Sequence, residues 1–178
     1  GKSTLAARIL NNCFPQLIFH PSQPTIVNPQ ILWVKFDLPG DAARSSICKA
    51  FFRAVDKILN KVDSIEMKPN FAKQYSGKKI EDMQDGIANI CLTYNIGLIV
   101  IDELQRLKIA KGGCEKVVLN FFNNLSNTTK TPILKIGTPA SFKLFEGDFE
   151  SGRRNMTNAL YEITPLEIGS NDWDYVVR

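Results

Sequence analysis

The chain has 178 residues, of which 44% are apolar and 22% are charged, and its formal net charge is +4. This is the composition of a globular domain with a core of its own. The longest apolar runs, such as the one ending at Ile101, are too short to span a bilayer, and there is no low-complexity tract, charge block or heptad array. Composition therefore excludes membrane-spanning, fibrous and low-complexity classes.

The chain starts at Gly1-Lys2-Ser3-Thr4, with no initiating Met and no strand before it. We therefore expect the sequence to be a piece of a longer protein. Residues 2–13 predict a helix that ends at Phe14-Pro15, because proline disfavours the helical conformation of the residue before it. The apolar side chains expected on one face of this helix are Leu5, Ala6, Ile9, Leu10 and Cys13.

A proline-containing stretch and a strand follow this helix. Residues 16–30 contain three prolines and predict an irregular or hairpin insertion. Residues 31–38 are mostly apolar and rich in β-forming types, which predicts one buried strand. After a turn at Pro39-Gly40, Asp41 is a candidate N-cap for the next helix. The side chains that this helix is expected to bury are Ile47, Ala50, Phe51, Ala54, Val55, Ile58 and Leu59.

Helices and strands alternate along the rest of the chain. Residues 61–78 are polar and predict a loop. The predicted helices cover 79–94, 114–126 and 139–146, the predicted strands cover 97–101, 132–137 and 160–163, and another helix is expected to begin after Asp172. This alternation predicts an α/β fold with a parallel sheet that helices cover on both faces.

The sequence predicts structural roles, and no catalytic role, for the cysteines and the single histidine. Cys13, Cys48 and Cys91 fall on the apolar phase of predicted helices, so buried free thiols are favoured over disulfides, and with them a cytosolic setting. His20 lies beside prolines with no nucleophile signature around it, which favours a structural role.

Gly1-Lys2-Ser3-Thr4 matches the end of a P-loop, G-x-x-x-x-G-K-[ST]. In such a loop, backbone N–H groups at a helix N-terminus bind phosphates. Lys2 would reach the β- and γ-phosphates, Ser3 would place its hydroxyl on Mg²⁺, and Thr4 could contact the α-phosphate. The tetrapeptide also occurs by chance, but here it opens an amphipathic helix, which is the context that a P-loop requires.

The apolar strand that ends at Ile101 is followed by Asp102 and Glu103. Asp102 is the expected magnesium ligand, directly or through water, and Glu103 is the expected residue that polarises the attacking water. The alternative is a strand that ends in two solvated acids. A P-loop sequence about a hundred residues upstream favours the nucleotide interpretation.

Two later features extend the predicted site. Thr138 follows the strand over 132–137 and could hydrogen-bond the γ-phosphate or the lytic water, although it also suits the N-cap of a helix that starts at Pro139. Arg153 and Arg154 follow Gly152, and one of them could reach the γ-phosphate bound by a neighbouring subunit. A solvated basic pair is the alternative, and the two arginines are not separable from sequence.

These motifs, in this order, resemble the core of an AAA+ ATPase. The segments Asp102-Glu103-Leu104-Gln105-Arg106-Leu107, Ile136-Gly137-Thr138-Pro139-Ala140 and Gly152-Arg153-Arg154-Asn155 resemble more closely the transposition ATPases of the TnsC/TniB type. The resemblance implies a P-loop NTPase sheet flanked by helices over 1–168 and the start of a helical lid over 169–178. It also implies that the chain lacks the first central strand and most of the lid.

The same resemblance implies a function. Proteins of this type bind ATP and Mg²⁺, form homo-oligomeric rings or filaments on double-stranded DNA, and connect a target-selecting protein to a transposase. DNA contacts would come from segments near 39–45 and 61–79, and the candidate DNA-binding residues are Lys68, Lys73, Lys78 and Lys79. A solvated loop explains any single lysine equally well. The implied location is the bacterial cytoplasm, with no membrane partner.

Two alternatives share the same motifs. One is another AAA+ ATPase, of the initiator or secretion type. The other is a scaffold that is switched by nucleotide and in which hydrolysis is incidental.

Overall fold

The structure is a computed structural model that describes residues 2–21, 28–61, 68–108 and 115–144, together with the single positions 162 and 169. The side chains of Lys2 and of residues 142–144 are outside this description. So are the strand predicted over 160–163, the helix expected after Asp172, and Cys114. None of the described helices is both long and apolar enough to cross a membrane.

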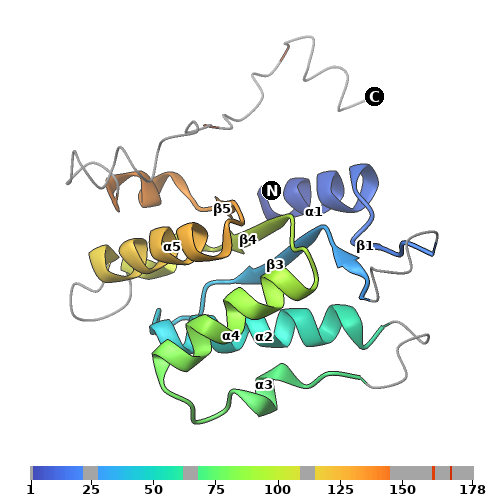
Figure 1. Cartoon of the computed structure of the whole chain (residues 1–178). Coiled ribbons are helices and arrows are strands. Elements are labelled where there is room, and N and C mark those ends of the chain that lie inside the picture. Colours follow the sequence, from blue (N-terminus) through green and yellow to red (C-terminus); the bar gives the residue numbers. More distant parts are fainter. Residues whose placement is uncertain are drawn as a thin grey trace.

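Three parallel strands form the centre of the fold (Figure 1). They are β3 (Trp33–Asp37), β4 (Leu98–Asp102) and β5 (Ile133–Lys135), in the order β3-β4-β5. The register pairs Asp37 with Asp102 and Ile101 with Lys135, so the carboxyl ends of the strands lie together at one edge. The predicted α/β fold with a parallel sheet is confirmed.

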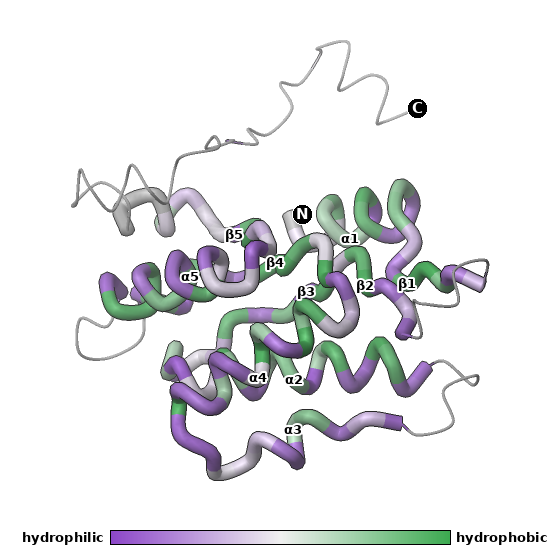
Figure 2. Tube along the Cα trace, viewed as in Figure 1, coloured by the Kyte–Doolittle hydropathy of each residue, from purple (hydrophilic) through white to green (hydrophobic). Residues whose placement is uncertain are grey.

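Three helices pack on one face of this sheet. They are α2 (Arg44–Leu59), α4 (Ile80–Thr93) and α5 (Glu115–Thr129). Their apolar stripes form one cluster with Ile99 and Ile101 of β4, both of which are fully buried. Figure 2 shows the apolar character of β3 and β4, as expected for strands that are covered on both faces. The helices predicted over 79–94 and 114–126 are confirmed.

The other face of the sheet carries α1 (Lys2–Cys13) and a smaller core. Its buried members are Leu10, Trp33 and Val100, and the Trp33 indole N–H donates to the Phe14 carbonyl at 3.3 Å. The helix predicted over 2–13 is therefore confirmed, but its buried face is narrower than expected. The predicted burial is wrong for Leu5 (41% exposed), Ile9 (47% exposed) and Cys13, because the side of α1 that faces the sheet carries Ser3 and Leu10 instead.

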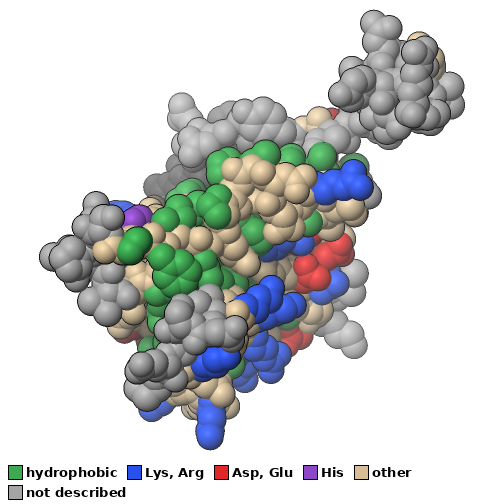
Figure 3. Space-filling view, turned by 90° about the vertical axis from the view of Figure 1, so that its right-hand side faces the viewer, with side chains coloured by type: hydrophobic (Ala, Val, Ile, Leu, Met, Phe, Trp, Pro, Cys, Tyr) green, Lys and Arg blue, Asp and Glu red, His purple; other side chains and the backbone are tan. Residues whose placement is uncertain are grey.

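Figure 3 shows the side of the molecule near the end of α1, where hydrophobic side chains form a band on the surface. The exposed large apolar residues of this region of the chain are Leu5, Ile9, Phe14 and Phe19.

The predicted insertion over 16–30 contains a short antiparallel pair, β1 (Leu17–Ile18) with β2 (Gln30–Ile31). His20 Nε2 lies 3.2 Å from Gln30 Oε1, a contact between the two arms that fits the structural role expected for this histidine. The single strand predicted over 31–38 is in fact divided between β2 and β3 at Leu32. Gly97 lies against this break, where a Cβ would come within 2.8 Å of the Leu32 carbonyl oxygen.

Three local predictions need correction. Asp41 does not occupy the N-cap of α2, which is Ala43, but it accepts hydrogen bonds from the Ala43 N–H (3.2 Å) and the Ser46 hydroxyl (2.7 Å). The loop predicted over 61–78 contains a helical turn, α3 (Phe71–Gln74). The helix predicted over 139–146 is the 3₁₀ helix η2 (Pro139–Leu144). A further element, the 3₁₀ helix η1 (Leu104–Lys108), was not predicted at all.

A buried carboxylate explains why α3 forms. Asp56 of α2 is 8% exposed and accepts hydrogen bonds from the backbone N–H groups of Phe71 (2.8 Å) and Ala72 (2.9 Å). These are donors that the start of a helix leaves free. This contact comes from a residue far away in sequence and has no local signal, whereas the N-cap contact of α3, from the Lys73 N–H to Asn70 Oδ1 at 3.0 Å, is local.

Candidate functional site

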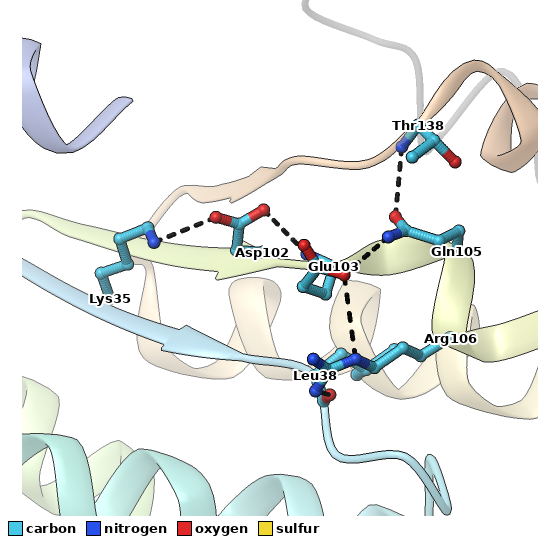
Figure 4. Close-up of polar contacts among 7 residues, drawn as sticks. All are labelled: Lys35, Leu38, Asp102, Glu103, Gln105, Arg106 and Thr138. Atoms are coloured by element: carbon cyan, nitrogen blue, oxygen red, sulfur yellow. Dashed lines mark hydrogen bonds and ion pairs between the residues drawn. The ribbon is translucent and has the colours of Figure 1, made fainter. Parts of the chain in front are cut away.

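The predicted site lies where the carboxyl ends of β4 and β5 meet the N-terminus of α1. Asp102 is the last residue of β4, and the Ser3 hydroxyl of α1 lies close enough to its carboxylate to lower its pKa. Thr138 follows the end of β5 and joins Glu103 through the side chain of Gln105 (Figure 4). Ser3, Asp102, Glu103 and Thr138, which are spread over most of the described chain, therefore lie in one region.

Asp102 is almost completely buried, with 1% exposure. Its Oδ1 accepts a hydrogen bond from the Glu103 N–H at 2.8 Å, and its Oδ2 lies 3.0 Å from Lys35 Nζ on the neighbouring strand β3. That second contact is an ion pair that does not count as a hydrogen bond, so Oδ2 is a buried acceptor with no hydrogen-bond partner among the described residues. A buried acceptor without a hydrogen bond is costly, and here the charge of Lys35 offsets part of that cost.

The charge of this carboxylate is stabilised despite its burial. Burial alone would raise the pKa of Asp102, but the Ser3 hydroxyl, the Lys35 ammonium and the Glu103 N–H together lower it below its usual range. A hydroxyl and an ionised carboxylate side by side are hard oxygen donors of the kind that Mg²⁺ prefers. Ser3 and Asp102 therefore fit a magnesium ion in their chemistry.

Glu103 has an unusual backbone conformation. Its φ is +63°, in the left-handed region that non-glycine residues seldom adopt and that is often found at functional sites. Its Oε2 accepts a hydrogen bond from Gln105 Nε2 at 2.7 Å and lies 3.9 Å from Arg106 Nε. Arg106 in turn donates from Nη1 to the Leu38 carbonyl at 2.7 Å. The carboxylate is thus fixed on one side by two neighbours from η1.

Thr138 uses its backbone in this arrangement. Its N–H donates to Gln105 Oε1 at 3.1 Å, and its carbonyl accepts from the Ser141 N–H (2.8 Å) and the Ser141 hydroxyl (2.6 Å). Thr138 does precede η2, as expected for an N-cap position. Among the described residues, however, no hydrogen bond of its hydroxyl is found, so that hydroxyl is available to another partner.

A comparison with known families decides the class of the protein. The family model of the AAA domain matches residues 1–145, which is most of the chain. The chain belongs to the AAA family. It is thus a P-loop ATPase of the AAA type, and its three-stranded parallel sheet with flanking helices is consistent with that fold. No curated protein matches the chain significantly.

Several predicted residues of this AAA domain are not brought into the site by the structure. Thr4 is exposed on α1. Gly1, the Lys2 side chain, Arg153 and Arg154 lie outside the described residues, so their predicted roles stay predictions. Lys68, Lys73, Lys78 and Lys79 are all exposed on the segment that follows α2, beyond the helical layer and on the far side of the sheet from α1 (Figure 1).

Three residues near the predicted AAA site were not singled out from the sequence, namely Lys35, Gln105 and Arg106. Lys35 is the only basic residue of β3 and lies between the buried residues Val34 and Phe36, and a charge among buried apolar residues indicates an ionic partner. Gln105 and Arg106 belong to the segment that resembles TnsC/TniB, but no role was predicted for them, because their contacts depend on η1, which brings them back toward Glu103.

Proposed function

We propose that this AAA domain binds ATP with Mg²⁺ and hydrolyses it, with Glu103 as the residue that activates water. One observation carries the proposal: the end of β4 holds a buried, ionised Asp102 in contact with Ser3 at the start of α1, and an adjacent carboxylate that is partly open to solvent. An apolar strand that delivers two acids to a helix N-terminus is the arrangement that phosphoryl transfer requires.

Ser3 and Asp102 would hold the magnesium ion, and Lys2 would bind the β- and γ-phosphates. When bound, the ion would neutralise charge on the phosphate oxygens. The N-terminus of α1 supplies unpaired backbone N–H groups and the positive end of the helix dipole, both of which stabilise phosphate. These groups bind and orient the nucleotide and need no covalent step.

Glu103 would accept a proton from the water that attacks the γ-phosphate. The phosphate–oxygen bond to the leaving ADP breaks as the new bond to the water oxygen forms, and the proton passes to the Glu103 carboxylate. The hydroxyl of Thr138 is a candidate donor to the γ-phosphate or to that water. We assign Arg153 or Arg154 the role of stabilising the transition state in a neighbouring subunit.

The Lys2→Ala and Glu103→Gln variants of the full natural protein separate binding from turnover. Lys2→Ala is expected to abolish nucleotide binding, measured with a fluorescent ATP analogue, because it removes the main counter-charge of the phosphates. Glu103→Gln is expected to bind ATP normally and to lose hydrolysis by at least about 100-fold. Binding by Lys2→Ala within threefold of the parent protein would contradict the site. Undiminished turnover in Glu103→Gln would contradict the mechanism.

We further propose that the protein is a regulator of transposition that assembles as a homo-oligomer on duplex DNA and connects a target-selecting protein to a transposase. The TnsC/TniB-like segments around Asp102, Thr138 and Arg153 support this proposal. So does the position of the lysine-bearing segment 68–79, which is exposed and separated from the nucleotide site by the sheet and the helices beneath it. Phosphate contacts need only such accessible cations.

Pelleting of the protein with duplex DNA, with and without ATP, tests this second proposal. ATP-dependent assembly is expected, and changing Lys73, Lys78 and Lys79 to Gln should weaken it and reduce its salt dependence. A matched control is Lys57→Gln, on α2. If assembly never depends on ATP and DNA, the regulator is excluded and another AAA ATPase is favoured. If Glu103→Gln supports unchanged assembly and downstream activity, a nucleotide-switched scaffold is favoured.

A further inference from the structure

We propose that Gln105 is a positioning residue that holds the Glu103 carboxylate in its working orientation and ties it to the end of β5. This inference rests on the proposed ATP hydrolysis and extends it to a residue that the nucleotide motifs do not include. The Gln105 amide stands between two groups of the site. It donates to Glu103 Oε2 at 2.7 Å and accepts from the Thr138 N–H at 3.1 Å (Figure 4).

The chemistry of the side chain suits this double contact. A carboxamide carries a donor and an acceptor on one planar group, whereas an ionised carboxylate only accepts and an aliphatic chain does neither. The bond to Glu103 has a charged acceptor, and such bonds are shorter and stronger than neutral ones. Gln105 can therefore fix a charged group and a backbone N–H at the same time.

The 3₁₀ helix η1 holds Gln105 in place. Leu104 and Leu107 on either side of it are buried in the main core, with exposures of 2% and 0%. The Leu104 N–H donates to the Ile136 carbonyl at 2.9 Å, which attaches η1 to the chain just before Thr138. The amide thus projects from a segment that is anchored by packing and by the backbone, so its position is set by the fold.

The contact leaves the two oxygens of Glu103 unequal. Oε2 is held by Gln105 and lies 3.9 Å from Arg106 Nε. No hydrogen bond to Oε1 is found in the described part of the chain, and the side chain is 33% exposed, so water can reach it. Since the residue sits at φ +63°, its side chain leaves the strand end in an unusual direction and needs such a restraint. One oxygen is fixed and the other is free to take a proton.

The same amide couples Glu103 to Thr138. A displacement of the chain at Thr138, such as a phosphate contact would cause, is transmitted to the carboxylate through two hydrogen bonds. Gln105 would therefore make activation of water depend on contact at the end of β5. An alternative role, in which Gln105 only stabilises η1, predicts a loss of stability and no specific effect on turnover.

Gln105→Glu is the most informative variant, because it has nearly the same shape. It keeps an acceptor for the Thr138 N–H, removes the donor to Glu103, and places a like charge beside Glu103. We expect kcat for ATP hydrolysis to fall about 10- to 100-fold, as for a misplaced catalytic group, with KM and the affinity for the ATP analogue within about threefold. Asn124→Asp on α5 makes the same change from amide to acid at an exposed position outside the proposed nucleotide and DNA sites, so it is the matched control and should leave kcat unchanged.

A double-mutant cycle tests whether Gln105 acts through Glu103. In the Glu103→Gln background, Gln105→Glu is expected to cause no further loss of the residual rate. A parental kcat in Gln105→Glu overturns the inference, and so does an equal loss in both backgrounds. A parent protein that does not hydrolyse ATP overturns the proposed function and the inference together, whereas a hydrolysing parent with an unaffected Gln105→Glu overturns the inference alone.

Discussion

The carboxylate of Asp102 and the ammonium of Lys35 show how a buried charge is tolerated in this sheet. The two residues come from neighbouring parallel strands, and the pair shares the sheet face that carries α1. Lys35 is 22% exposed, so its charge is partly solvated, while Asp102 has almost no contact with solvent. The acid therefore depends on its partner more than the lysine does.

Lys35→Met is expected to destabilise the ligand-free protein by about 2–4 kcal/mol, because it leaves a buried carboxylate without its counter-charge. Adding Asp102→Asn to this variant should cost less than the sum of the two single changes. Urea denaturation of the single and double variants measures this coupling, and Lys49→Met on α2 serves as the control. Additive effects would show that the 3.0 Å pair contributes nothing.

The thiols give a second prediction for single side chains. Burial raises the pKa values of Cys48 and Cys91 to about 12, whereas Cys13 is exposed. Because the thiolate is the reactive form, a thiol reagent at pH 8 should modify Cys13 in the native protein and reach Cys48 and Cys91 only after denaturation. Peptide mapping by mass spectrometry reads out each site. Rapid native labelling of Cys91 would contradict its burial.

The same thiols make stability depend on alkaline pH. Their pKa values are higher in the folded state than the unperturbed 9.0, so their contribution is complete below pH 9 and is lost as the pH rises toward 12. Each thiol should lower the free energy of unfolding by up to about 1.4 kcal/mol per pH unit in this window. A double Cys48→Ala, Cys91→Ala variant should show a flatter profile than the parent protein.

Among the helices and strands, the contact of α3 with α4 is closely fitted. The ring of Tyr75, just after α3, stacks on Phe52 with centroids 4.5 Å apart and lies directly over Gly86 of α4. A Cβ at position 86 would overlap the Tyr75 ring. Glycine in the middle of a helix costs about 1 kcal/mol relative to alanine, so its presence here is explained by the space that Tyr75 needs.

Gly86→Ala is therefore expected to lower stability by about 1–3 kcal/mol, although alanine is the better helix former. In a Tyr75→Ala background the same change should be neutral or stabilising, because the obstructing ring is gone. Thermal unfolding of the four proteins measures the cycle, with Asp85→Ala on the exposed side of α4 as the control. A stabilising Gly86→Ala in the parent protein would mean that Tyr75 moves aside freely.

The elements that the sequence predicts well are those whose signal is local and repeated. The apolar run of β4 is buried as predicted, and most of the predicted stripe of α2 is buried too. Ala50 and Ala54 are only half-buried, and the fully buried Phe52 was not predicted. The elements that it misses are held by distant partners: α3 by the carboxylate of Asp56, and η1 by buried leucines and the chain near Ile136. Cys13 was wrongly expected to be buried because a helix pattern does not tell how much of the helix meets the sheet.

The candidate site also contains residues that the sequence predicts and residues that it does not. Ser3, Asp102, Glu103 and Thr138 stand out because they occupy motif positions at helix starts and strand ends. Lys35 and Gln105 enter through the register of β3 with β4 and through the path of η1, and neither can be obtained by counting along the chain.

The two faces of the central sheet differ in the size of the apolar core that covers them. Among the described residues, the face that carries α2, α4 and α5 holds the large core, while the small cluster on the other face has one buried side chain from α1, Leu10. Since local stability follows buried apolar contact, α1 should open more readily than the other long helices. The helix that carries the predicted phosphate-binding residues is thus the most weakly held of the four.

Hydrogen exchange followed by mass spectrometry tests whether α1 is less stable than the other long helices. Without nucleotide, amides of α1 are expected to exchange faster than those of α2 and α4, and ATP with Mg²⁺ should slow exchange in α1 and at the end of β4. Exchange in α4 is the internal control and should not respond. Equal protection of α1 and α2 without ligand would contradict the importance of the small core.

The parallel register has a consequence for how the protein is made. The groups gathered at the strand ends run from Ser3 to Thr138, and β3 pairs with β4 across more than sixty intervening residues. Closing such long loops is slow, and parallel pairing is rewarded only after they close. No early stretch of the nascent chain can therefore hold part of the site. On the ribosome, the ability to hold nucleotide should arise late and in one step, after the residues that follow β5 have emerged.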